Sequence, residues 1–219
     1  MSDLLPFWAT QLPAMLRGMV VSLQVTGAAL AIGIPLGLAA ALAVQSPSRL
    51  VRLPVLALVE IGRGAPALIL LQFAYFGLPS AGIQLSAMLS AIAALAWTTG
   101  AYTSEIIRAG LQAVARGQHE ASTALGMSRL DELRFVIVPQ GMRVAAPALL
   151  GFAILMLQAT SLCFTIALPE LLSQAYRIGT VTFRYMEALM LAALLYAAIC
   201  IPATVLVAVI ERRLGRHTA

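Results

Sequence analysis

The sequence predicts an all-α integral membrane protein. Of its 219 residues, 61% are apolar and only 11% are charged, whereas soluble domains average about 45–50% and about 25%. The apolar residues are gathered in five long stretches, and a helix needs roughly 20 such residues to cross the hydrocarbon core. The stretches do not alternate polar and apolar residues, as the strands of a membrane β-barrel would. We therefore expect about five transmembrane helices.

The first 18 residues are expected to form an amphipathic segment that lies in the membrane interface. The segment "MSDLLPFWATQLPAMLRG" has an early acidic residue and no basic amino-terminal region, so it does not resemble a cleaved signal peptide. Trp8 and Arg17 are suited to the interface, because each has an apolar body and a polar tip. We expect this segment to remain in the mature protein.

The five predicted spans together form one transmembrane domain, residues 19–210. The first span contains Gly33 and Gly37 on either side of Pro35, which is a spacing that allows close helix packing and predicts a kink. The last span carries no charged residue at all. In order along the chain, the predicted spans are residues 19–44, 54–78, 83–102, 145–168 and 188–210.

The second span is the least regular, because Glu60 and Arg63 lie one turn apart within it and Gly64 and Pro66 follow. This pattern favours an ion pair at the interface with a local kink. A direct role of the pair in a transport pathway is the less favoured alternative.

The distribution of basic residues predicts the orientation in the membrane. All 14 basic residues are arginine. Ten of them lie in the connections after the first and third spans or follow the fifth span, three lie on the opposite side, and Arg63, inside the second span, is not counted. Cytoplasmic loops carry the excess of positive charge in membrane proteins. We therefore expect the N-terminus outside, and the loop of residues 105–143 and the tail of residues 211–219 inside.

The sequence shows no catalytic, metal or cofactor site. The two cysteines, Cys163 and Cys200, lie in separate apolar runs, and the two histidines, His119 and His217, lie far apart. There is no phosphate-binding loop, which would need a lysine that this chain lacks. The positive charge is explained by membrane orientation, so we expect no nucleic-acid partner.

A polar segment interrupts the apolar sequence between the third and fourth spans. Residues 105–125 are predicted to form one helix, which Gly126 ends. Ser128 and Asp131 have the spacing of a capping box that starts a second helix, and Pro139 is expected to end or kink this helix before the fourth span. Two short helices bury little apolar surface alone. Docking to a partner and a self-packed loop both remain open from the pattern.

The segment "EASTALGMSRLDELRFVIVPQ" resembles the EAA loop of the membrane subunits of ATP-driven importers. Glu120, Ala121, Gly126 and Pro139 match the family's pattern, whereas Ser122 and Val138 replace an alanine and a leucine.

Three further segments are similar to the histidine, glutamine and arginine branch of polar amino-acid importers. These are "RGAPALILLQFAYFGLP", "AYTSEIIRAGLQAVARGQHEA" and "SLCFTIALPELLSQA". The resemblance extends over residues 16–213.

The resemblance implies a permease subunit of the bacterial inner membrane that imports a polar amino acid by alternating access. Its EAA loop would form a coupling helix seated in a cytoplasmic ATP-binding subunit, which would hold ATP and magnesium as one of a pair. The other implied partners are a second permease subunit, identical or paralogous, an extracytoplasmic solute-binding protein and membrane lipid. The residues expected to contact the ATPase are Glu120, Ala121, Ser122, Leu125, Gly126, Ser128 and Arg129. A passive channel or a membrane scaffold without an ATPase remains the alternative.

Polar residues inside the spans are the candidates for the solute pathway. They are Gln72, Thr98, Thr99, Gln158, Thr160 and Ser161. Relatives typically carry Leu-Lys-Asp-Thr-Ser-Leu where this chain reads "LQATSL", so Gln158 replaces the lysine and Ala159 the aspartate. Loss of the carboxylate disfavours a cationic solute. We expect either a neutral or acidic amino acid, or a subunit whose partner holds the solute.

Overall fold

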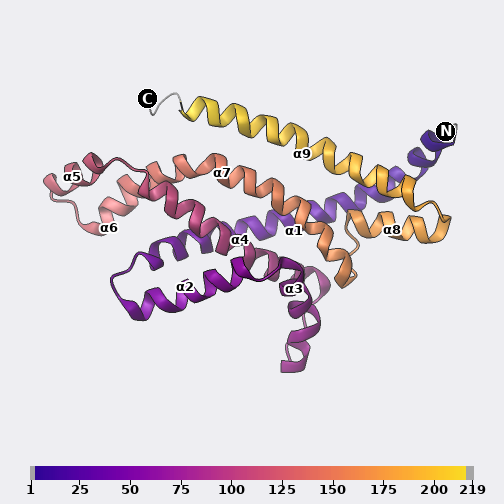
Figure 1. Cartoon of the computed structure of the whole chain (residues 1–219), viewed down its shortest axis with the longest axis horizontal. Coiled ribbons are helices and arrows are strands. Elements are labelled where there is room, and N and C mark those ends of the chain that lie inside the picture. The colour runs from indigo at the N-terminus through magenta and orange to yellow at the C-terminus, as the bar shows by residue number, and fades with distance from the viewer. Residues whose placement is uncertain (1–2, 216–219) are drawn as a thin grey trace.

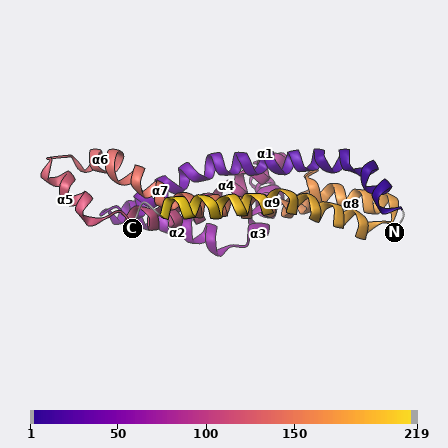
Figure 2. The ribbon, with the colours of Figure 1, turned by 90° about the horizontal axis from the view of Figure 1, so that it is seen from above.

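The structure is a computed structural model that describes residues 3–215, and all secondary structure in this range is helical. The long helices run side by side in a bundle (Figure 1), which is a thin slab when it is turned by 90° (Figure 2). The α-helices are α1 (Leu4–Val44), α2 (Arg49–Gly64), α3 (Ala67–Gln72), α4 (Ala87–Gln112), α5 (Arg116–Ala124), α6 (Arg129–Glu132), α7 (Val138–Ala159), α8 (Leu171–Thr182) and α9 (Tyr185–Gly215). The remaining helical turns are η1 (Phe73–Gly77), η2 (Leu78–Ala81), η3 (Leu133–Ile137) and η4 (Thr160–Ile166).

Helices α1 and α4 share the most extensive contact between two elements of the described chain. A Cβ atom at Gly33 would overlap the side chain of Thr99, and one at Gly37 would overlap Thr103 Oγ1. Both threonines are fully buried, and each donates its hydroxyl to a carbonyl one turn earlier in α4. The close packing predicted from the Gly33–Gly37 spacing is therefore confirmed. Helix α1 continues through Pro35.

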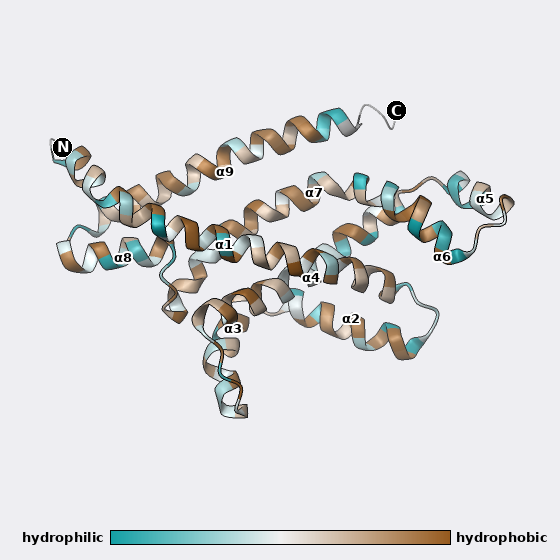
Figure 3. Cartoon of the chain, turned by 180° about the vertical axis from the view of Figure 1, so that it is seen from behind, coloured by the Kyte–Doolittle hydropathy of each residue, from teal (hydrophilic) through white to brown (hydrophobic). Residues whose placement is uncertain are grey.

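Three helical segments of the described chain are long and apolar enough to cross a membrane: Leu4–Val44, Arg129–Ile166 and Tyr185–Arg213. A fourth crossing is obtained if α2 and the segment Ala67–Ala81 are counted as one. The third predicted span falls mostly in α4, which is not among these segments and carries several threonines in its buried middle. Figure 3 shows the long helices mostly in the hydrophobic colour, with hydrophilic residues gathered on α5 and α6.

The second predicted span is broken rather than locally kinked. Helix α2 and the helical segment Ala67–Ala81 are bent by 105° relative to each other. The break lies at Ala65, whose backbone is extended, with a ψ of 134°. The ring of a following proline disfavours the helical conformation, so Pro66 forces Ala65 out of the helix. The predicted ion pair between Glu60 and Arg63 is present at 3.6 Å.

The fourth predicted span starts earlier than expected, because the helix does not end at Pro139. The segment Arg129–Ile166 is helical over 38 residues. Just before Pro139, η3 is a π-helical turn in which the Val138 amide donates to the Leu133 carbonyl. This wider turn rearranges the backbone hydrogen bonds at the point where proline lacks an N–H group.

Residues 4–18 are continuous with the first span in α1, not a separate helix. Forty-one residues make α1 about 60 Å long, twice the roughly 30 Å of the hydrocarbon core. Its first turns pack on α8 and α9: Met15 is fully buried there, and Trp8 Nε1 donates to the Glu187 carbonyl at 2.9 Å. At the other terminus α9 extends to Gly215, and the rest of the predicted tail, with His217, lies outside the described residues.

Substituting Gly37 by valine should destabilise the subunit, because the new side chain has no space against Thr103. Overpacking of this kind typically costs about 1–3 kcal/mol. The expected result is a lower midpoint temperature of unfolding in detergent. The measurement is the loss of the monodisperse peak on heating. Gly27→Val is the matched control on the same helix, because no atom lies within 4 Å of its Cβ position. Equal midpoints for the two variants would contradict the tight α1–α4 contact.

Candidate coupling hairpin and solute pathway

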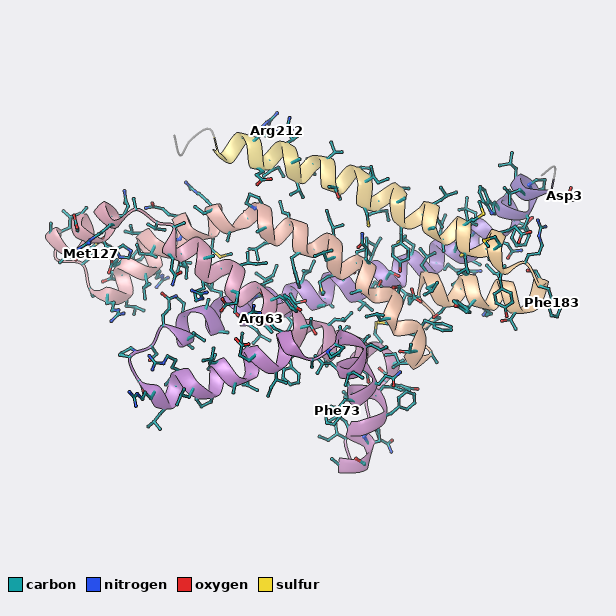
Figure 4. All side chains as sticks on the ribbon, viewed as in Figure 1. Asp3, Arg63, Phe73, Met127, Phe183 and Arg212 are labelled. Carbon is teal, nitrogen blue, oxygen red and sulfur yellow. The ribbon has the colours of Figure 1, made fainter. Side chains whose placement is uncertain are left out.

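The polar segment forms a helical hairpin at one end of the bundle. We call residues 116–132, which comprise α5, the following turn and α6, the polar hairpin. Figure 4 shows Met127 of this hairpin at the end of the molecule opposite Asp3 and Phe183. The predicted single helix over residues 105–125 is wrong, because α4 ends at Gln112 and α5 starts at Arg116. Val114 lies between them, and its side chain is buried in the core. This anchors the turn of the chain between the two helices.

The turn of the polar hairpin has the predicted chemistry. Gly126 has a φ of +70°, in the left-handed region that favours glycine. The Met127 amide donates to the Ser122 carbonyl at 3.1 Å, which closes the end of α5. Ser128 Oγ then accepts the Asp131 amide at 3.2 Å and donates to Asp131 Oδ2 at 2.6 Å. The helix stop at Gly126 and the cap at Ser128 are therefore confirmed.

The predicted ATPase-contact residues lie on the hairpin surface, with one exception. Ala121 is exposed, Leu125 is 80% exposed, and Glu120 forms a 3.2 Å ion pair with Arg116 in solvent. The exception is Ser122, which is only 3% exposed and donates to the Gln118 carbonyl. The other exposed members of the set are Gly126, Ser128 and Arg129. This surface combines small and apolar side chains with charges.

An ion pair lies where α4 leaves the bundle towards the polar hairpin. Arg108 donates to both carboxylate oxygens of Glu105, three residues earlier in α4. This pairing compensates both charges near the end of α4.

The predicted solute-pathway residues do not form one surface in the isolated subunit. Thr98, Thr99 and Thr160 are buried, and each donates its hydroxyl to a carbonyl of its own helical segment. Gln72 and Gln158 are exposed. Ser161 is half-buried and donates to the Gln158 carbonyl at 2.8 Å. The first three therefore contribute to helix packing, whereas the exposed pair is open to a neighbouring molecule.

Glu170 is a polar residue at the centre of the fold that sequence reasoning missed as a site. Its side chain is fully buried, and it caps α8 by accepting the Leu172 and Ser173 amides at 2.8 and 2.7 Å. The Tyr196 hydroxyl of α9 donates to the same carboxylate at 3.3 Å and lies 3.4 Å from Thr160 Oγ1. An acidic residue after Pro169 and before an apolar run is a helix-start signal that could have identified it.

The chain matches a known family and known structures over most of its length. Residues 33–216 match the family described as "Binding-protein-dependent transport system inner membrane component". This chain belongs to that family.

Two curated relatives of this permease support its membership of the family. It is 35% identical to YckA, a probable amino-acid ABC transporter permease protein of Bacillus subtilis (strain 168), over 94% of this chain and 91% of the relative. It is 33% identical to the glutamate/aspartate import permease protein GltK of Escherichia coli O157:H7, over 92% of this chain and 94% of the relative.

A solved structure agrees with the fold. The crystal structure of an amino acid ABC transporter with histidines has a TM-score of 0.87 and 35% identity, and the match covers 94% of this chain and 96% of that chain. The protein is therefore a multi-pass permease component of the inner membrane, and it is not itself a catalyst.

Replacing Glu170 by leucine should destabilise the permease, because the Leu172 and Ser173 amides would lose their acceptor inside the protein. Leaving buried polar groups unsatisfied costs about 1–3 kcal/mol each. The expected result is a lower thermal midpoint in detergent and faster amide hydrogen exchange at the start of α8. Glu211→Leu, at an exposed position near the end of α9, is the control. A variant as stable as this control would show that the Glu170 cap contributes little.

Proposed function

We propose that this permease imports a polar amino acid by alternating access and is driven by separate ATP-binding subunits. The observation that carries the proposal is the polar hairpin, whose exposed face presents Ala121 and Leu125 outside the apolar bundle. Covering the apolar side chains of a short helix with a partner groove lowers the free energy. Membership of a binding-protein-dependent transport family supports an ATPase as this partner.

The energy source is expected on other polypeptides. This chain has no phosphate-binding loop and no lysine, so a pair of ATP-binding subunits would supply ATP and magnesium. Closure of this pair would move docked hairpins as rigid bodies and switch the pathway between its outward-open and inward-open states. Such switching requires that the two states bind ATP with different affinity.

The complete importer would contain a second permease and a solute-binding protein. Five crossings in one subunit are few to enclose a path, so we propose an identical or paralogous partner in the membrane. The extracytoplasmic binding protein would deliver the solute to this pair. Family membership supports the delivery step, because systems of this family depend on a binding protein.

We propose five crossings with the N-terminus outside and the polar hairpin inside. The arginine distribution supports this orientation. The positions of Asp3 and Met127 at opposite ends of the bundle in Figure 4 are consistent with it. Helix α4 would be the third crossing: 26 residues are long enough, and α1 and α7 shield its polar middle from lipid.

The proposed solute is a neutral or acidic amino acid. Gln158 is exposed at the end of α7, and Ala159 follows where relatives carry aspartate, so this site provides no carboxylate for a cationic solute. The relative GltK is named for import of glutamate and aspartate, whereas the relative ArtQ of Bacillus subtilis (strain 168) is named for arginine transport, so the names of relatives do not decide the class and the proposal rests on Gln158 and Ala159. The second hypothesis is that the partner permease holds the solute and this subunit does not.

Ala121→Trp should abolish transport without preventing membrane insertion, because a bulky ring would stop the polar hairpin from seating in the ATPase. The measurement is uptake into proteoliposomes that contain the complete importer, with glutamine, glutamate, cystine and arginine tested in parallel. Interface residues that matter typically cost more than 1 kcal/mol, or about fivefold in affinity, so co-purified ATPase should also fall. Ala198→Trp, at an exposed position on α9, is the control and should transport normally. Full uptake by Ala121→Trp, or uptake by the wild type without ATPase, would favour a passive channel.

Single cysteines should report the proposed orientation. In a Cys163→Ala, Cys200→Ala background, Val181→Cys should react with a membrane-impermeant maleimide on intact spheroplasts. Leu130→Cys should react only after permeabilisation. Both positions are more than 70% exposed in the subunit, so access depends on the side of the membrane. The reverse labelling pattern would place the hairpin outside and exclude ATPase coupling.

A further inference from the structure

The polar hairpin stands over a cavity instead of packing densely on the bundle. The cavity has a volume of about 540 Å³ and lies between the polar hairpin, η3 and the ends of α1 and α4. Its lining includes Gln45, Gln112, His119, Thr123 and Glu132. Ser122 is the one buried residue of α5, so apolar packing does little to hold α5 in place. Its attachment depends on a few specific contacts.

Two side-chain hydrogen bonds cross from α5 to another element. His119 Nδ1 lies 2.7 Å from Glu132 Oε1, and Gln140 Nε2 donates to Gln118 Oε1 at 3.1 Å. A carboxylate only accepts, so His119 donates through Nδ1. Within the described residues, these are the side-chain hydrogen bonds that leave α5 for a different helix.

Both bonds lead to the same helix. Glu132 and Gln140 belong to the continuous helical segment Arg129–Ile166. They are eight residues apart, which is about 12 Å along a helix axis. On α5 the two bonded residues, Gln118 and His119, are adjacent, so the bonds hold one position of α5 to two positions of the segment. The side chain of Glu132 is only 18% exposed, so solvent screens its bond less than it screens the ion pair of Arg116 with Glu120.

The docking face and the bonded face of α5 are different. Gln118, His119 and Ser122 lie on the side that faces the segment Arg129–Ile166, whereas Glu120 and Ala121 lie on the exposed side. A partner seated on the exposed side would therefore leave both hydrogen bonds intact.

We infer that the His119–Glu132 bond, supported by the Gln118–Gln140 bond, makes α5 one rigid body with the fourth predicted crossing. His119 and Glu132 are positioning residues: they transmit displacement of the docked hairpin to α7 and on to η4, where Thr160 and Ser161 lie. The inference rests on the proposed function and adds which crossing receives the movement.

Breaking the bond should uncouple ATP hydrolysis from transport. The test uses the complete importer in proteoliposomes and the amino acid of the panel that the wild type takes up. The measured quantity is solute moved per ATP hydrolysed, because a misfolded fraction lowers both rates together and leaves their ratio unchanged. His119→Ala and Glu132→Met should lower this ratio about threefold or more, as expected for positions that modulate coupling.

Rescue variants and a matched control separate this role from a general structural one. His119→Asn retains a donor near the position of Nδ1, and the exchange His119→Glu with Glu132→His restores a pair, so both should recover the ratio to within about twofold. Thr123 lies on the same helix and lines the same cavity, but its hydroxyl bonds only within α5. Thr123→Val should therefore leave the ratio unchanged. An unchanged ratio in His119→Ala and Glu132→Met would overturn the inference.

A covalent tether tests the rigid-body arrangement directly. In the cysteine-free background, His119→Cys with Glu132→Cys would be joined by a short bifunctional thiol reagent. Transport should be low before the reaction and should recover after it. A tether that blocks transport would show that α5 must move relative to α6, and would overturn the inference.

A wild-type complex without ATP-driven uptake would refute the proposed function and the inference together, whereas wild-type uptake with unaffected variants would refute the inference alone.

Discussion

The absence of water from the hydrocarbon core is the constraint on which the structure depends. A polar group in this region needs a partner within the protein, because an unsatisfied one costs several kcal/mol. In the described part of the chain, no buried side-chain nitrogen or oxygen lacks a hydrogen-bond partner. Threonines such as Thr26 and Thr204 donate to a carbonyl one turn earlier in their own helix. Glu170, the one fully buried carboxylate described, is bonded by two amides and a tyrosine hydroxyl.

Self-satisfied hydroxyls and small residues together make the centre of the bundle compact. In lipid the association of helices depends on close packing, because the surrounding chains are as apolar as leucine. Gly33 and Gly37 provide that close packing in α1, and the threonines of α4 fill the space opposite them without exposing a polar group. The polar hairpin has the opposite composition and lies beyond one end of the bundle, where water can solvate it. The bundle and the solvated hairpin therefore differ in composition, although the helical segment Arg129–Ile166 belongs to both.

The parts of the fold that the sequence predicts are those set by local composition. Helix α9 was predictable because residues 188–210 contain no charge, and the hairpin turn because Gly126 and Ser128 have defined local roles. The parts that it does not predict depend on distant residues. The break at Ala65 is braced by Trp97 and Tyr102 of α4, which donate to the carbonyls of Leu58 and Arg63. Likewise, the Tyr196 hydroxyl lies within hydrogen-bonding distance of both Glu170 and Thr160. Tyr196 follows Glu170 by 26 residues along the chain. The sequence also could not show which of the six proposed solute residues are buried. In the structure three of them are buried threonines and two are exposed glutamines.

The continuity of the segment Arg129–Ile166 gives the hairpin a mechanical connection to the proposed solute residues. At 1.5 Å per residue, its 38 residues span about 57 Å, which exceeds the thickness of the hydrocarbon core. A helix that ended at Pro139 would separate the hairpin from the membrane by a flexible joint, and the π-helical turn η3 avoids that joint while accommodating the proline. Glu132 and Thr160 therefore lie on one continuous helical segment, which also contains Pro139 and Pro147. From Thr160, the Tyr196 hydroxyl and Glu170 extend the connection to α9 and α8. Because the same helical segment carries the hairpin at one end and this buried network at the other, a partner docked as proposed would act on helices that it never touches.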